Sequence, residues 1–236
     1  MKRLKENTGK KARLLVVDPH PLFRCGLVET ISHTRDLVCC GEADNASDAQ
    51  KAVLKLKPDL MTLGLRLKRG DGLDLIKILK SEFPSVKVLV LSQLDEFTYA
   101  ERALRAGAMG YVMKDSAPVE ILSAIRRVMA GDILVSHEIS NLAIRRMVGG
   151  LSTAHNGPAS FIDVLTDREL QIFSLLGQGE STGKISRDLC LSLKTIESHR
   201  ENIKQKLGLH NAADLIHHAT LWVRNQAGQR SDLLNP

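Results

Sequence analysis

The sequence has no apolar run long enough to cross a lipid bilayer. Its uninterrupted apolar runs, such as Val88–Leu91, span only a few residues, whereas a membrane-spanning helix needs about 20. The basic segment Met1–Lys5 is not followed by an apolar stretch of signal-peptide length. We therefore expect a cytoplasmic protein that has no membrane partner.

Metal-ligand spacing is also missing. The four cysteines do not form a ligand pattern, and the adjacent Cys39 and Cys40 would alternate sides on a strand. We expect reduced, buried or half-buried thiols; a redox switch is an alternative that the spacing does not support. The sequence also lacks a nucleophile–base set and a phosphate-binding glycine loop. We therefore expect no enzyme activity, no metal and no cofactor.

Positive charge is scarce in the C-terminal third of the chain. The net charge is +6, yet the residues from 161 onward carry nine basic and nine acidic side chains. Residues 1–13 carry six basic side chains against Glu6 alone. The excess charge therefore describes a basic tail, over residues 1–12, that we expect to be a solvated, disordered arm. Non-specific contact between this tail and DNA phosphates is the alternative.

Short apolar runs alternate with helical patterns from residue 12 to about residue 132. We expect strands over 13–18, 37–40, 60–64, 86–92 and 111–114, and helices over 23–32, 46–56, 72–83, 97–106 and 118–130. Five βα units with short apolar strands predict a doubly wound, five-stranded parallel sheet covered by helices on both faces. This α/β domain is expected over residues 13–132.

A change of composition then predicts a second domain. The segment Gly149–Ser160 is rich in turn formers and has no periodicity, which is typical of an interdomain linker. A connecting helix can form over Ile139–Met147, and the pattern from Phe161 onward is wholly helical. We expect a linker over 133–160, an all-α domain over 161–228 and a short tail over 229–236.

One predicted helix of this second domain has an apolar edge and a polar edge. Ile196, Ile203 and Leu207 share one edge, and Lys194, Ser198, Glu201 and Gln205 point the opposite way. A half-buried helix with exposed hydrogen-bonding groups suits a DNA major groove, although an ordinary surface helix has the same pattern. Ser192 is the expected N-cap.

Sequence motifs favour the DNA-binding interpretation. They are Leu165-Thr166-x-Arg168-Glu169, Leu176-Gly177-x-Gly179, Ser192-x-x-Thr195-Ile196-x-x-His199, Asn202-Ile203 and Lys206-Leu207-Gly208. The segment resembles the LuxR-type domain of NarL/FixJ-type response regulators, a four-helix domain. That resemblance implies that the helix beginning near Thr195 lies in the major groove and that the final helix dimerises.

The resemblance assigns candidate residues to these two roles. The expected DNA-binding residues are Lys194, Thr195, Glu197, Ser198, His199, Arg200, Glu201 and Lys204, with Lys206 as a further phosphate anchor. The expected dimerisation residues are Leu215, Ile216, Ala219 and Trp222. The expected partners are double-stranded DNA and a second copy of the chain.

The first domain carries a second set of motifs. They are Leu15-Val16-Val17-Asp18-x-His20-Pro21, Pro58-Asp59-Leu60, Asp71-Gly72-Leu73, Leu91-Ser92 and Ala106-Gly107-Ala108-x-Gly110-Tyr111-Val112-x-Lys114. They resemble the receiver domain of response regulators. In such receivers, acids at the ends of the first and third strands bind Mg²⁺, and the third-strand aspartate accepts a phosphoryl group. Sites at these strand ends follow the general rule for open α/β sheets.

Two of the acids that the resemblance implies are missing. Pro19 follows Asp18 where a second acid is expected, and Gly64 stands where the acceptor aspartate belongs. The degenerate pocket then consists of Asp18, Pro19, Gly64, Ser92, Tyr111 and Lys114, and we expect Lys114 to pair with Asp18. Asp71 and Asp74 are weaker substitutes because they lie beyond the strand, and Lys68 and Arg69 are expected to make the pocket mouth more basic. The alternative is that the pocket residues now serve only packing and solubility.

These observations predict a response-regulator-type transcriptional regulator that binds DNA and works without phosphorylation, because Gly64 replaces the acceptor. A receiver-based adaptor that binds an unknown protein partner, with weak or vestigial DNA binding, is the alternative. The neutral charge of residues 161–236, the unusual Glu201 and the helix-weakening Gly183 motivate it.

Overall fold

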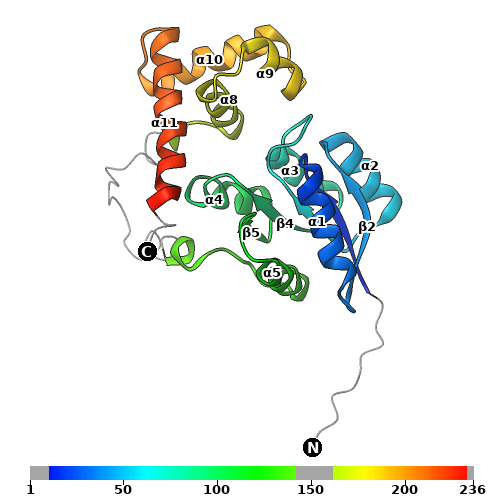
Figure 1. Cartoon of the computed structure of the whole chain (residues 1–236). Helices are drawn as coiled ribbons and strands as arrows, with labels where there is room; N and C mark the ends of the chain where they lie inside the picture. The colour runs from blue at the N-terminus through cyan, green and yellow to red at the C-terminus, as the bar shows by residue number, and fades with distance from the viewer. Residues whose placement is uncertain (1–10, 142–161, 233–236) are drawn as a thin grey trace, which may run out of the picture. The chain divides into compact units, whose positions relative to one another are not determined.

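The computed structural model describes residues 11–141 and 162–232, with side chains described as far as residue 226. These residues form two compact units. One is built mainly from the chain up to Ser136, and the other from Phe97–Arg102 and the chain from His137 onward (Figure 1). Most of the predicted basic tail (residues 1–10), the predicted linker segment Gly149–Ser160 and the last four residues lie outside the described ranges.

The first unit contains a five-stranded sheet in which every strand pair is parallel. The strands are β1 (Ala12–Val17), β2 (Leu37–Ala43), β3 (Leu60–Leu63), β4 (Lys87–Ser92) and β5 (Gly110–Met113), in the spatial order β2-β1-β3-β4-β5. Leu14 is paired with Leu60, and Met61 with Val88, so β1, β3 and β4 are central. Central strands are buried on both faces, and all four residues of β3 are buried.

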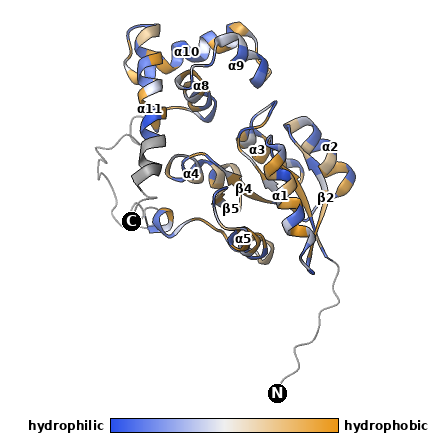
Figure 2. Cartoon of the chain, viewed as in Figure 1, coloured by the Kyte–Doolittle hydropathy of each residue, from blue (hydrophilic) through white to orange (hydrophobic). Residues whose placement is uncertain are grey.

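Five helices alternate with the strands: α1 (Pro21–Ser32), α2 (Ala46–Leu56), α3 (Gly72–Glu82), α4 (Glu96–Ala106) and α5 (Pro118–Ala130). Each helix shows a mixture of polar and apolar residues (Figure 2), as expected when one side of a helix covers a sheet. The core joins alternate residues of β1 and β4, such as Leu14, Val16 and Leu89, to Ile31 of α1 and Ile125 of α5. The doubly wound parallel fold expected from the sequence is therefore confirmed.

Local sequence explains where several helices begin and end. Asn45 accepts a hydrogen bond from the Asp48 N–H (2.9 Å) and Asp71 from the Asp74 N–H (3.0 Å), which caps α2 and α3. Gly131 ends α5 in the left-handed conformation, with φ 106°. After this turn Leu134 forms a parallel bridge with Gly110 at the sheet edge. The first unit therefore extends beyond residue 132, where the sequence pattern stops.

The second unit contains α8 (Asp167–Gly177), α9 (Thr182–Leu189), α10 (Leu193–Leu207) and α11 (Ala212–Asp232). Side-chain oxygens of Thr166, Ser181 and Ser192 cap α8, α9 and α10, which confirms the predicted cap at Ser192. The helices α8 and α11 approach closely at Gly177, where a Cβ atom would lie 2.3 Å from the Ala219 carbonyl oxygen. Glycine permits this approach because it has no side chain. None of the described helices is both long and apolar enough to span a membrane.

The cysteines differ in part from the prediction. All four are unpaired thiols, and Cys39 and Cys40 are half-buried as expected, but Cys25 and Cys190 are exposed. Cys25 lies on α1, and Cys190 is the left-handed C-cap of α9, with φ 55°. A helix end and an outward helical position expose these two side chains, which composition alone could not reveal.

Candidate functional sites

Two places in the structure bring the candidate residues together. The first, here named the strand-end cluster, lies at the carboxyl ends of the parallel strands and contains Asp18, Pro19, Gly64, Ser92, Tyr111 and Lys114. Asp18, Gly64 and Lys114 directly follow β1, β3 and β5, and Ser92 ends β4. The second is the exposed face of α10.

Asp18 and Lys114 form a buried ion pair between Asp18 Oδ2 and Lys114 Nζ, with side-chain exposures of 2% and 6%. The predicted pairing is therefore confirmed. The other carboxylate oxygen of Asp18 accepts a hydrogen bond from the His20 N–H (2.9 Å) and lies 3.0 Å from His20 Nδ1. Lys114 Nζ also lies 4.5 Å from the centre of the Phe23 ring, a cation–π contact.

Burial lowers the pKa of Lys114, although the hydrogen bond and the negative charge of Asp18 act in the opposite direction. A buried ammonium group depends on a close counter-ion to remain charged. Asp18 supplies that counter-ion and so favours the charged form of Lys114. His20 and Phe23 complete the surroundings of the pair, and no sequence pattern had singled them out as neighbours of Lys114.

Gly64 has no room for a side chain in this arrangement. A Cβ atom built at Gly64 would lie 2.5 Å from Asp18 Oδ2 and 3.5 Å from Pro19 Cδ. Carbon–oxygen contacts of 2.5 Å do not occur without movement of one group. The Asp18 carboxylate therefore occupies the space into which a side chain at position 64 would project.

The remaining members of the strand-end cluster are tied to the loop after β4. Ser92 Oγ accepts a hydrogen bond from the Leu94 N–H (3.0 Å), and the Tyr111 hydroxyl donates one to the Leu94 carbonyl (3.0 Å). Tyr111 is 1% exposed. Ser92 and Tyr111 therefore fix the loop through the N–H and the carbonyl group of Leu94. The Tyr111 side chain lies buried on the edge strand β5.

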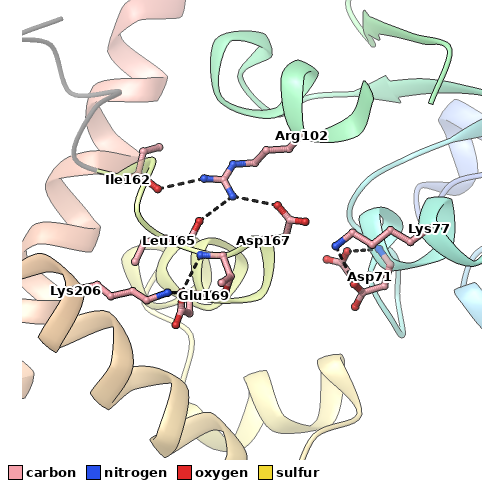
Figure 3. Close-up of polar contacts among 10 residues, drawn as sticks. Asp71, Lys77, Arg102, Ile162, Leu165, Asp167, Glu169 and Lys206 are labelled. Atoms are coloured by element: carbon pink, nitrogen blue, oxygen red, sulfur yellow. Dashed lines mark hydrogen bonds and ion pairs between the residues drawn. The ribbon is translucent and has the colours of Figure 1, made fainter. Parts of the chain in front are cut away.

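The carboxylates beyond β3 have structural roles. Asp71 caps α3, and Asp74 forms an ion pair with Lys77 (3.7 Å; Figure 3 shows Asp71 and Lys77). Lys68, which was expected to make this region more basic, pairs with Asp44 at 2.5 Å. The positive charge of Lys68 is therefore balanced by Asp44. The Asp71 and Asp74 carboxylates stabilise the first turn of α3.

The buried and exposed sides of α10 are those that its sequence predicts. Ile196 and Ile203 are fully buried, whereas the side chains of the opposite edge are exposed: Lys194, Glu197, Ser198, Glu201 and Gln205. At its beginning, Ser192 Oγ accepts from the Thr195 N–H (3.1 Å) and contacts the Thr195 hydroxyl (2.8 Å). Thr195 and His199 are half-buried, so they belong to the border of the face.

Two of the candidate basic residues are paired within the unit. Arg200 donates to Glu197 Oε1 (3.0 Å) and to the Thr182 hydroxyl of α9 (2.8 Å). Lys204 forms an ion pair with Glu201 (2.7 Å). The side chains of Arg200 and Lys204 are only 16% and 21% exposed. Their charges are therefore neutralised locally before any ligand binds.

Lys206, expected as a further phosphate anchor, has a partner inside the unit. Its Nζ lies 2.6 Å from Glu169 Oε2, and the same carboxylate oxygen accepts bonds from the N–H (2.8 Å) and hydroxyl (2.9 Å) of Thr166 (Figure 3). Burial alone would raise the pKa of Glu169, but Lys206 and Thr166 outweigh it and lower the pKa. The contact ties the start of α8 to the end of α10, whereas the Thr166-x-x-Glu169 capping pattern predicts only the local bonds between Thr166 and Glu169.

The residues expected to dimerise lie mainly inside the second unit. Leu215 and Ala219 are fully buried and Trp222 is 6% exposed, with the Trp222 ring 5.7 Å from that of Phe173 on α8. Ile216 is the exception, at 44% exposed. Helical spacing identified a true apolar edge, but that edge forms the core of the unit, which leaves Ile216 as the member available to a partner.

Two family models match the chain: the response regulator receiver domain over residues 14–126 and the bacterial regulatory proteins of the luxR family over residues 163–219. The oxygen regulatory protein NreC of Staphylococcus aureus (strain MRSA252) is 28% identical over 208 residues, which cover 88% of this chain and 96% of that protein.

Solved structures are similar over the same range. RcsB from Salmonella enterica serovar Typhimurium, bound to promoter P1flhDC, superimposes with a TM-score of 0.63 at 23% identity and covers 89% of this chain and 98% of its own. A LuxR-family two-component response regulator from Aurantimonas sp. SI85-9A1 superimposes with a TM-score of 0.54 at 27% identity. It covers 59% of this chain and 99% of its own. The likeness to RcsB supports the fold.

Proposed function

This chain belongs to the response regulators that join a receiver domain to a LuxR-family regulatory domain, and we propose that it regulates transcription by binding duplex DNA without receiver phosphorylation. The receiver role is assigned to residues 13–132 and the DNA-binding role to residues 161–228. The exposed face of α10 supports the second role, because it presents hydrogen-bonding side chains on a helix whose opposite side is anchored by Ile196 and Ile203. Such a helix can enter a major groove.

The position of the Asp18 carboxylate, in the space where a side chain at Gly64 would lie, supports the proposed phosphorylation independence. Gly64 stands where the family places its acceptor aspartate, and glycine has no carboxylate to accept a phosphoryl group. The Asp18 carboxylate fills the space beside Gly64 and is already paired with Lys114. The lysine that would contact a phosphoryl group therefore has an internal partner.

The strand-end cluster does not fit a divalent cation. Mg²⁺ requires oxygen ligands and binds proteins through one or two carboxylates together with phosphate or water. In this cluster the only carboxylate is Asp18, one oxygen of which is paired with Lys114 and the other with His20. Pro19 and Gly64 offer no side-chain oxygen. The function that we propose therefore needs no metal ion at this cluster.

Phosphorylation independence can be tested with the purified full-length chain. After incubation with acetyl phosphate and Mg²⁺, we expect no increase in the intact mass and no change in the affinity for duplex DNA. A receiver that retains its acceptor aspartate, treated in parallel, confirms that the reagent is active. A stable phosphoryl adduct would contradict this part of the proposal.

DNA binding itself can be tested by capture of fragments from the source genome at two salt concentrations. Lys194→Ala removes an exposed cation from the start of α10, and we expect it to weaken duplex binding about two- to tenfold at low salt. Glu29→Gln, an exposed change on α1, is the control. If Lys194→Ala binds duplex DNA as tightly as the wild type, the start of α10 does not contact the DNA.

An adaptor function is the second candidate, and one observation favours it. Arg200 and Lys204 are both ion-paired within the unit, in a domain whose formal charge is balanced. A protein partner at the receiver would then carry the function, with homodimerisation as a further possibility for the full chain. Absence of duplex binding at both salt concentrations, with the protein folded, would support the adaptor.

A further inference from the structure

Glu197 and Glu201 place two exposed carboxylates on α10, which general affinity for DNA does not require. We propose that these two glutamates are specificity-determining residues, which accept hydrogen bonds from cytosine amino groups and reject duplex sites that lack them. The inference rests on the proposed DNA binding and concerns which sequences are bound.

The two carboxylates lie one helical turn apart on the same side of α10. Residues four apart on a helix are neighbours, separated by about 6 Å along the axis. Both glutamate side chains are 57% exposed. Because successive base pairs are about 3.4 Å apart, two side chains with this spacing would reach bases roughly two pairs apart.

One oxygen of each carboxylate is paired with a basic side chain of α10. Glu197 Oε1 accepts from Arg200, which is itself bonded to Thr182 of α9, and Glu201 Oε2 is paired with Lys204. The second oxygen of each carboxylate accepts no bond from the part of the chain that the structure describes. The side chains are therefore restrained, and each keeps an acceptor for a ligand.

The electrostatics of the domain make this acceptor selective. A carboxylate that enters a groove is repelled by the phosphates, and residues 161–236 have no excess positive charge to offset that repulsion. Binding becomes favourable where a base supplies a donor to the carboxylate. A glutamate that finds no donor in the groove raises the energy of the complex, which is how a binding surface rejects wrong sites.

Base chemistry then selects cytosine. In the major groove cytosine presents an amino donor, whereas guanine and thymine present only acceptors to a hydrogen-bonding group. Adenine presents an amino donor beside the N7 acceptor, and a carboxylate has no proton to give to N7. Glutamine differs, because its amide both donates and accepts and therefore matches adenine.

The experiment compares the sequences selected from a randomised duplex library by the full-length wild-type chain, Glu201→Gln and the control Glu29→Gln. We expect the sites selected by the wild-type chain to contain a preferred cytosine. In the sites selected by Glu201→Gln, adenine should be preferred at the position of that cytosine, and the other positions should be unchanged. Glu201→Gln should also bind unselected duplex severalfold more tightly, because one repulsive charge is gone. Glu29→Gln makes the same charge change on α1, at an exposed glutamate that pairs with the exposed His33, and should match the wild type in both respects.

Glu197→Gln, treated in the same way, should alter a second position about two base pairs from the first. The inference is overturned if wild-type protein selects a motif and both variants select the same motif with the same discrimination over unselected duplex. If the wild-type chain binds no duplex, the proposed function fails together with the inference. Melting temperatures of all variants establish that the comparison is made between folded proteins.

Discussion

At Gly64 the choice of residue follows from a neighbour that is distant in sequence. The Asp18 carboxylate turns toward Lys114 and takes the room beside position 64. A cation placed in apolar surroundings keeps its charge only with such a partner. Lys114 and Gly64 are therefore two parts of one packed arrangement around the Asp18 carboxylate.

This arrangement predicts that even a methyl group at position 64 is costly. Gly64→Ala should lower the free energy of unfolding by about 1–3 kcal/mol, because the new carbon forces Asp18 or the backbone to move. Gly26→Ala is the matched control, since a Cβ atom there meets no atom within 4 Å and α1 is an ordinary helix. It should stabilise by up to about 1 kcal/mol. Urea unfolding of both variants checks this, and equal stabilities would contradict the described contact.

The thiols offer a second test at the same scale. Burial raises the pKa of Cys39 and of Cys40, and the thiolate is the form that reacts with alkylating reagents. Cys25 and Cys190 are exposed. We expect iodoacetamide near neutral pH to label Cys25 and Cys190 well before the other two, as measured by peptide mass spectrometry over time. Faster labelling of Cys39 or Cys40 would show that β2 is more open than described.

Among the elements, α8 and α10 are joined by a polar contact that their apolar packing does not require. The Glu169 carboxylate is 3% exposed and depends on Lys206 and Thr166 for its hydrogen bonds. Lys206→Ala leaves a buried carboxylate with fewer donors, which should destabilise the second unit by about 1–3 kcal/mol. Lys184→Ala, which removes an exposed lysine paired with Glu180, should leave the melting temperature nearly unchanged, because exposed ion pairs contribute little to stability. Thermal unfolding followed by the fluorescence of Trp222 reports on this unit.

The same contact predicts a dependence on pH. The folded-state pKa of Glu169 lies below its ordinary value, so the ionised carboxylate binds fewer protons in the folded than in the unfolded chain. Its contribution to stability is then complete above the ordinary glutamate pKa, about 4.3, and is lost as the pH falls through the folded value. Glu169→Gln should lose this part of the acid dependence. An identical acid profile for both proteins would contradict the role of the ionised carboxylate.

The elements were predictable because their signals are local. Alternating apolar runs located all five strands, and the bounds expected for α2 and α5 are those observed. Contacts between distant segments were less accessible. The Asp18–Lys114 pair followed from the family resemblance, but Lys206 with Glu169 and Arg200 with Thr182 join helices whose relative placement no local pattern specifies. Leu134 was missed as an edge partner because Gly131 ends the helical pattern before it.

For the molecule as a whole, charge and recognition belong to different segments. The positive excess lies in the first residues of the chain, and residues 161–236, to which we assign DNA binding, are formally neutral. Attraction to phosphates and the reading of bases are separable contributions to DNA binding. Under the proposed function, the neutral charge of residues 161–236 predicts that sequence recognition contributes more than bulk electrostatics to the choice of binding site. This view agrees with the restrained glutamates of α10.

The homodimer that we propose is the remaining prediction at this scale, and α11 makes it testable. We expect Ile216→Asp to convert a dimer to a monomer with little change in melting temperature, because Ile216 is 44% exposed. Trp222→Ala should instead lower the free energy of unfolding of the second unit by about 3–5 kcal/mol, since the Trp222 ring packs on Phe173 in the core. Sedimentation and circular dichroism separate the two effects. If Ile216→Asp leaves the association state unchanged, the homodimer must form through another surface, because the other predicted dimerisation residues are already buried within one chain.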